Sequence, residues 1–366
     1  MITLKLGTQM ELIILFLTVL TTVTNAEIIF VAKQGSSEDI MTINEAKTIR
    51  NISRHEARDL EGTLSIDGAI AFMSARSSSF DIFVSDRNGG NLQNLTRSSE
   101  YESSPLFSPD GKWITFRAQT DKGKEWKLKV MKRDGSGVRT LGVADDILDV
   151  SWSPDSKMVV YAAMKGTDSF LFIVDRETLT TREIVRASIN SELHSEAFQK
   201  PISIRVQITA CKWSPNAKWI AYVRHPEIGA NQQLRIVDPK SKEDRLVVEQ
   251  KYAPQDPVWS KDSKRILFAS ATVFNFVIDK MSGKQSFEGE VHIFISELSG
   301  KTRQITTGKG LHRRPVWSPN EHMIAFLYED SLSSETSLRL MDMSGAVMKV
   351  LHENVFYRTP LQWVGE

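Results

Sequence analysis

The stretch Phe107-Ser-Pro-Asp-Gly111, followed by Trp113-Ile-Thr-Phe116, decides the fold, because versions of it return along the chain. Each copy has a bulky anchor residue, a turn and a short apolar strand. The turn carries Ser first, Pro second and Gly fourth, as β-turns prefer. A degenerate first copy begins at Leu64. The later copies are anchored on Phe107, Trp152, Trp213, Trp259, Trp317 and, in a truncated last copy, Trp363.

The anchors recur at the spacing of propeller blades. Successive anchors lie 43, 45, 61, 46, 58 and 46 residues apart, and a four-stranded blade takes about 40–45 residues. Alternating segments such as Lys127-Leu-Lys-Val-Met131 predict a third strand in each unit, and Leu92-Gln-Asn-Leu-Thr96 predicts a short fourth one. The pattern therefore predicts an all-β fold, a single β-propeller of four-stranded blades.

The two ends of the chain supply complementary parts of one blade. Residues 27–53 predict a second, a third and a fourth strand, whereas Leu361-Gln-Trp-Val364 predicts only a first strand. Pairing the C-terminal strand with the N-terminal strands would close the ring and remove exposed sheet edges. Counting first strands gives seven blades. Six is the alternative, if the N-terminal segment packs irregularly.

Residues 1–26 predict a secretory signal peptide, which leaves residues 27–366 as the propeller domain. Residues 12–23 form an apolar run that is shorter than the roughly 20 residues needed to span a bilayer. Lys5 precedes this run, and small residues ending at Ala26 suit cleavage there. An uncleaved anchor helix is the alternative. No later run approaches spanning length, so we expect an exported protein, periplasmic or extracellular, that does not span the membrane after cleavage.

The composition disfavours several classes of function. The 366 residues include 46 Lys plus Arg and 45 Asp plus Glu, a net charge of +1. This balance argues against a nucleic-acid partner, because binding phosphates depends on an excess of basic residues. The single cysteine, Cys211, excludes an internal disulfide and a zinc site of paired thiolates. We expect a monomer without a cofactor or a bound metal.

The recurring hairpin, the third strand followed by Asp and Gly, and fourth strands such as Arg303-Gln-Ile-Thr306 resemble the TolB-type, WD40-like (PD40) propeller repeats. The resemblance covers essentially all of residues 27–366. It implies the fold but little about function, because propellers host many unrelated activities. Dipeptidyl-peptidase-type enzymes place similar propellers in front of a hydrolase domain, but this chain contains no Gly-x-Ser-x-Gly elbow.

The recurring anchors are interpreted as structural, since a residue present in nearly every blade packs between blades rather than forming one binding site. Charged residues near the innermost strands are the candidates for a binding site at the channel mouth. They are Glu61, Asp149, Arg224, His225, Asp256, His312, Arg313, Arg314, Tyr357 and Arg358.

Within this set, the cluster His312-Arg313-Arg314 is expected to face the channel mouth. Glu61, Asp149 and Asp256 stand three residues before their anchors, as Arg314 does. The arginines would clamp the carboxylate of a charged peptide or a sugar acid. The alternative is internal salt-bridging among channel residues.

The variable segments lie between strands two and three or between blades, and in a propeller these emerge on one face. They are residues 117–125, 186–207, 224–233, 271–290 and 327–336. We therefore predict a non-catalytic binding or scaffold module that presents this loop-rich face to a protein, a peptide or a glycan. The alternative is a propeller enzyme, a lyase or hydrolase with its site in the funnel. Against it, His312 is the only histidine at an innermost-strand position.

Overall fold

The computed structural model describes residues 26–35, 37–119, 123–188, 207–225, 231–250, 254–278, 285–330 and 335–365. Residues 1–25 of the expected signal peptide lie outside this range, as do parts of all five variable segments. The regular elements of the described residues are strands, and this part of the chain has no apolar helix long enough to cross a bilayer.

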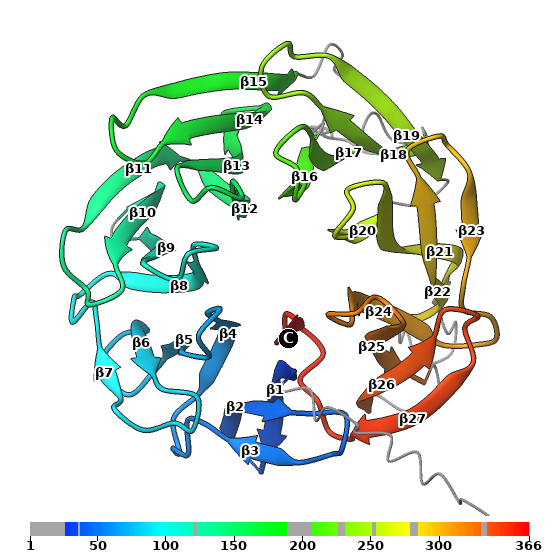
Figure 1. The fold of residues 1–366 in the computed structure, drawn as a ribbon, viewed down its shortest axis with the longest axis horizontal. Coiled ribbons are helices and arrows are strands. Elements are labelled where there is room, and N and C mark those ends of the chain that lie inside the picture. Colours follow the sequence, from blue (N-terminus) through cyan, green and yellow to red (C-terminus); the bar gives the residue numbers. More distant parts are fainter. Residues whose placement is uncertain are drawn as a thin grey trace, which may run out of the picture.

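The strands form seven blades arranged around a central axis (Figure 1). Blade 1 holds β1 (Glu27–Gln34), β2 (Ser37–Ile43), β3 (Ile49–Asn51) and the last strand, β28 (Gln362–Val364). Blade 2 holds β4 (Asp59–Leu64), β5 (Ile70–Ser74), β6 (Asp81–Ser85) and β7 (Gln93–Asn94). Blade 3 holds β8 (Tyr101–Phe107), β9 (Trp113–Gln119), β10 (Trp126–Lys132) and β11 (Arg139–Ala144). Blade 4 holds β12 (Asp146–Trp152), β13 (Met158–Lys165), β14 (Asp168–Asp175) and β15 (Thr181–Ala187).

The remaining three blades follow the same order. Blade 5 holds β16 (Gln207–Trp213), β17 (Ile220–His225), β18 (Gln232–Val237) and β19 (Asp244–Gln250). Blade 6 holds β20 (Gln255–Trp259), β21 (Arg265–Ile278), β22 (Gln285–Glu297) and β23 (Thr302–Gln304). Blade 7 holds β24 (Leu311–Trp317), β25 (Met323–Glu329), β26 (Thr336–Asp342) and β27 (Val347–His352). One parallel bridge, Val291–Leu311, joins blades 6 and 7.

The C-terminal strand closes the ring. β28 pairs antiparallel with β1, with Trp363 opposite Ile28. The Gln362 side chain reaches across to blade 2, where it accepts a hydrogen bond from the Leu64 backbone N–H (2.8 Å) and donates to the Leu64 carbonyl (3.1 Å). The prediction of a seven-bladed ring closed by the two chain ends is confirmed.

Three of the tryptophan anchors, Trp152, Trp259 and Trp317, hydrogen-bond to the blade before their own. The Trp152 indole donates to the carbonyl of Leu106 (3.3 Å), which directly precedes the anchor of blade 3. Trp259 and Trp317 make the equivalent bonds, to the carbonyls of Lys212 (3.0 Å) and Val258 (3.3 Å). A buried indole that fills the wedge between blades and satisfies its N–H adds both apolar contact and a hydrogen bond.

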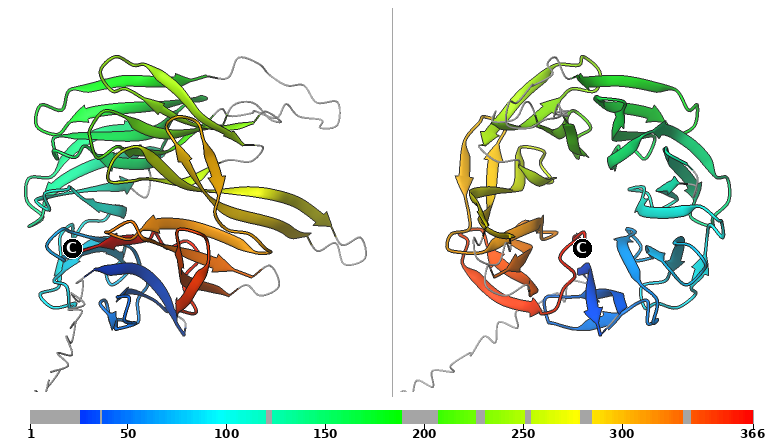
Figure 2. Two further views of the ribbon diagram at one scale, coloured as in Figure 1. Left: turned by 45° about the vertical axis from the view of Figure 1, so that its right-hand side comes forward. Right: turned by 180° about the vertical axis from the view of Figure 1, so that it is seen from behind.

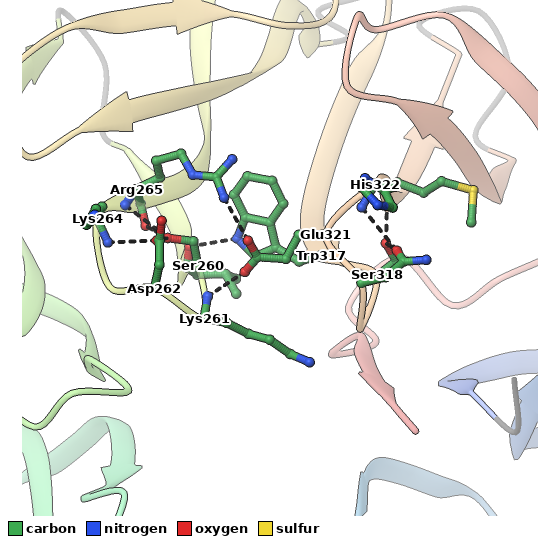
Figure 3. Close-up of polar contacts among 12 residues, drawn as sticks. Ser260, Lys261, Asp262, Lys264, Arg265, Trp317, Ser318, Glu321 and His322 are labelled. Carbon is green, nitrogen blue, oxygen red and sulfur yellow. Dashed lines mark hydrogen bonds and ion pairs between the residues drawn. The ribbon is translucent and has the colours of Figure 1, made fainter. Parts of the chain in front are cut away.

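A second set of links crosses between blades at the turns that follow the anchors (Figure 3). In blade 6 the Ser260 hydroxyl donates to Asp262 (2.5 Å) and accepts the Arg265 backbone N–H (3.0 Å), which holds the turn. Glu321 of blade 7 accepts from the backbone N–H of Lys261 and from the Arg265 guanidinium (2.7 Å). The turn of blade 6 is therefore hydrogen-bonded to blade 7. We call the side of the ring that carries these turns the turn face.

The opposite side carries the variable segments, and we call it the loop face. β21 and β22 extend beyond the ring there as a long hairpin (Figure 2), paired from Arg265–Glu297 to Ile278–Gln285. The variable segment 271–290 is therefore strand for most of its length. The C-terminal strand ends on the other side, at the turn face (Figure 2).

Candidate functional site

The first strands of five blades share a β-bulge three residues before the anchor. At these positions the backbone is left-handed, with φ between 49° and 53°, in Glu61, Ser104, Ala210, Asp256 and Arg314. The strand register shifts at each of them. A left-handed backbone costs about 1 kcal/mol or more for a residue with a Cβ, and a bulge redirects side chains. The repeated strain therefore marks the wall of the channel.

The channel contains a cavity of about 760 Å³. Its lining comes mainly from blades 2, 3 and 4 and from the C-terminal segment, and it reaches Ile66 and Pro109 in the turns of the turn face. Its charged lining residues are Glu61, Arg117, Asp149, Lys212, Arg314 and Arg358. Aliphatic side chains, among them Leu106, Leu148 and Leu361, separate these charges.

Polar contacts join the channel side chains from blade to blade. Glu61 Oε2 in blade 2 accepts from the backbone N–H (2.6 Å) and the hydroxyl (3.0 Å) of Ser104 in blade 3. Asp149 in blade 4 accepts two bonds from Lys212 Nζ in blade 5, at 2.9 and 2.7 Å. Burial opposes the charge of Lys212, but Asp149 outweighs it and raises the pKa of Lys212. Each contact holds a carboxylate of one blade against the next blade.

The third contact of this kind joins blades 6 and 7, where Arg314 Nη1 lies 3.5 Å from Asp256 Oδ1. Arg117 has a backbone partner instead of an acidic one, since its Nη1 donates to the Ile147 carbonyl at 2.7 Å. Arg358 is exposed, and its guanidinium lies 5.1 Å from the centre of the Tyr357 ring. Among the described residues, no acidic side chain lies within ion-pair distance of Arg358.

His312 does not face the channel, contrary to the expectation from the sequence. It lies within β24 and is 5% exposed, with Nδ1 2.9 Å from the Val291 carbonyl oxygen and its ring stacked on His292. The bulge at Arg314 interrupts the alternation of side chains along β24. Arg314 therefore lines the cavity, whereas His312, two residues earlier, does not. Arg313 does not line the cavity either, and its Nη1 lies 4.0 Å from Glu329 Oε2.

Arg224 and His225 end β17 and do not line the cavity either. His225 Nε2 lies 3.0 Å from the Thr209 hydroxyl, and burial lowers the pKa of this imidazole. His225 belongs to blade 5 and His312 to blade 7, so the structure does not bring the two histidines together. No cluster of His, Cys, Asp and Glu suited to a metal occurs within the described ranges.

The cavity thus unites four of the predicted residues, Glu61, Asp149, Arg314 and Arg358, with Asp256 beside Arg314 and Tyr357 beside Arg358. Sequence reasoning missed Ser104, Arg117 and Lys212. Ser104 stands three residues before Phe107, so aligning this position across all blades would have found it. Arg117 and Lys212 carry no such signal, because their roles depend on the neighbouring blade.

Fold and channel together define a seven-bladed β-propeller built from sequence repeats. Residues 24–196, just under half of the chain, match the family described as the TolB beta propeller domain (PD40), so this part of the chain is similar to TolB-type propeller repeats. Over 147 residues it is 24% identical to the Tol-Pal system protein TolB of Desulfosudis oleivorans, and over 127 residues 30% identical to a TolB homolog of Chlorobium luteolum. These alignments cover 40% and 34% of this chain, but only 33% and 28% of the two relatives.

Solved structures share the architecture at low identity. TolB from Acinetobacter baumannii superposes with a TM-score of 0.51 at 13% identity, over 93% of this chain and 82% of that one. An oligogalacturonate lyase from Vibrio parahaemolyticus gives 0.61 at 11% identity, over 86% of each chain. A puromycin hydrolase gives 0.64 at 12% identity, over 91% of this chain and 53% of that one. These likenesses show the fold alone.

Proposed function

We propose that this protein is a non-catalytic binding module that takes an extended polypeptide segment into its channel from the turn face. The observation that carries the proposal is the cavity of about 760 Å³, whose lining reaches the turns at Ile66 and Pro109. Ligand sites typically measure about 300–1,000 Å³ and combine apolar walls with a few fixed polar groups. The strained bulges hold those groups on rigid strands.

The lining favours a polypeptide over a sugar. Aliphatic side chains such as Leu106, Leu148 and Leu361 suit the side chains of a peptide. The aromatic lining residues Phe107 and Trp152 are 6% and 5% exposed, so their faces offer little area for stacking on a sugar ring. Among the described lining residues there is no histidine or cysteine. The enzyme alternative, which would place histidines in the funnel, therefore gains no support from the lining.

The proposal places the ligand on the turn face rather than on the loop-rich face favoured by the sequence. We also propose that the protein is exported to the periplasm or beyond, because residues 1–26 have the pattern of a signal peptide. We propose that it acts as a monomer.

The test is to pan a phage library of random dodecapeptides on the purified protein and to measure the enriched peptides by fluorescence anisotropy. Leu148→Trp, which adds volume inside the cavity, should weaken their binding at least about tenfold. Leu246→Trp is the matched control, because Leu246 lies on the outermost strand of blade 5 and is 48% exposed. Thermal melting of both variants checks that the fold is kept.

The proposal fails if no peptide is enriched, or if enriched peptides bind Leu148→Trp as well as the unchanged protein. Trigalacturonate serves as the sugar-acid probe in the same assay. Binding of trigalacturonate that is lost in Leu148→Trp, without any peptide binding, would replace the polypeptide with a glycan ligand.

A further inference from the structure

We infer that the channel selects its polypeptide ligand by one acidic side chain and that Arg358 is the residue that binds this carboxylate. The inference rests on the proposed function and adds the chemistry of the ligand. It follows from how the charges on the channel wall are arranged around the ring.

Three carboxylates on the channel wall each contact a polar or basic group of the next blade. Glu61 of blade 2 is held by Ser104 of blade 3, and Asp149 of blade 4 by Lys212 of blade 5. Asp256 of blade 6 faces Arg314 of blade 7. Each carboxylate belongs to an even-numbered blade and its partner to the next odd-numbered one. These contacts pair blade 2 with blade 3, blade 4 with blade 5 and blade 6 with blade 7. Because the ring has seven blades, blade 1 has no partner blade in this scheme.

Blade 1 is the blade into which the segment carrying Arg358 leads, because β28 follows four residues later. Arg358 lines the cavity and is exposed. Its guanidinium lies 5.1 Å from the centre of the Tyr357 ring. Among the described residues, Arg358 is therefore an exposed guanidinium on the wall that has neither a carboxylate nor a backbone carbonyl as its partner.

The other basic lining groups are already engaged. Arg117 donates to the Ile147 carbonyl, and its guanidinium lies 5.2 Å from the centre of the Trp126 ring. Lys212 and Arg314 each face an acid. Among the seven charged groups discussed, four are basic and three acidic, so the wall carries one positive charge in excess. A ligand carboxylate would restore the balance.

A guanidinium suits this task because its planar fork of N–H donors matches the two oxygens of a carboxylate. A ligand with several acidic groups would meet Glu61 and Asp149 on the same wall and be repelled. Leu361, three residues from Arg358, and Leu106 supply aliphatic contacts. The matching segment therefore carries one acidic residue flanked by aliphatic residues.

The experiment uses the dodecapeptides enriched in the panning above, synthesised with amidated C-termini. Replacing the acidic residue of each peptide by Gln should weaken binding about tenfold, as expected for loss of a charge-assisted pair. Arg358→Glu should reject the acidic peptide and bind its Lys counterpart instead. Arg182→Glu is the control, since Arg182 is exposed on the outermost strand of blade 4.

Recovery of binding between Arg358→Glu and the Lys peptide would support the inference, because a merely misfolded variant cannot regain affinity for the reversed charge. Enriched peptides without an acidic residue would overturn it and leave the proposed function standing. So would acidic peptides that bind Arg358→Glu unchanged. Peptides insensitive to Leu148→Trp would instead overturn the proposed function.

Discussion

The interface between blades 2 and 3 and the interface between blades 6 and 7 bury ionisable side chains at the same two positions, but with opposite chemistry. The first has Asp81 in β6 and Glu102 in β8, and the second has His292 in β22 and His312 in β24. Glu102 and His312 are each the second residue of their first strand. Asp81 and His292 each precede an isoleucine whose backbone N–H donates to a threonine hydroxyl.

Both interfaces favour the neutral form of the residue on the first strand. Glu102 is 1% exposed, and burial, reinforced by the nearby Asp81, raises its pKa from 4.5 to about 7. Burial lowers the pKa of His312 from 6.5 to about 4, although its bond to the Val291 carbonyl favours the charged form. Burial between blades therefore penalises either sign of charge, whichever residue occupies the position.

The two residues therefore give stability opposite dependences on pH. A raised acid pKa stabilises the folded state fully below pH 4.5, and that stabilisation is lost as pH rises toward 7. A lowered histidine pKa stabilises the folded state above pH 6.5, and that stabilisation is lost as pH falls toward 4. Between pH 4.5 and 6.5 the two contributions offset each other, so single variants are needed to separate them.

Glu102→Gln should have the largest effect on the pH dependence of stability. The variant cannot ionise, so it should be more stable than the unchanged protein by about 2–3 kcal/mol at pH 8 and nearly equal to it at pH 4.5. Urea unfolding across this range measures the difference. Glu353→Gln, at an exposed position, is the control that should show no such trend. Parallel stability curves for Glu102→Gln and the unchanged protein would contradict the assignment.

His312→Phe should remove the opposite dependence, with a slightly smaller effect. Between pH 6.5 and 4.5 the unchanged protein should lose about 2 kcal/mol relative to the variant, because the imidazole takes up a proton in the unfolded state but stays neutral in the folded state. At pH 8 the variant should be about 1 kcal/mol less stable, since the Val291 carbonyl loses its donor. A variant as acid-sensitive as the unchanged protein would show that His312 is not the group responsible.

Trp317→Phe and Trp213→Phe should differ in their loss of stability by a smaller amount, because only one of the two indoles has a hydrogen-bond partner. The Trp317 indole donates to the Val258 carbonyl, whereas the Trp213 indole nitrogen is buried without a hydrogen-bond partner in the described structure. Trp317 is buried and Trp213 is only half-buried, so Trp317→Phe removes one hydrogen bond and more buried apolar area and should cost at least about 1 kcal/mol more. Thermal or urea unfolding of the pair measures it. Equal losses would mean that the indole bond adds nothing net.

Some of the channel could be predicted from the chain alone. The position three residues before each anchor places Glu61, Asp149 and Arg314 on the channel wall, and it does so because the repeat maps equivalent residues onto equivalent places. The prediction for His312 was wrong because a bulge interrupts the two-residue alternation of side chains along β24. The partner Lys212 could not be foreseen, since it lies on a strand more than sixty residues away from Asp149. Ser104 does occupy the repeated position, but its bond to Glu61 depends on how two blades meet.

The blade and the number of copies are encoded locally, because an anchor, a turn and alternating strands recur at one spacing and no single unit can bury its own apolar face. The closure is also encoded in the sequence, since the two ends hold complementary strands. The meeting of charges from different blades, the extent of the cavity lining and the lack of an acidic partner for Arg358 among the described residues became visible only in the folded ring. Those outcomes depend on how side chains from separate blades converge on one axis, which a local pattern does not encode.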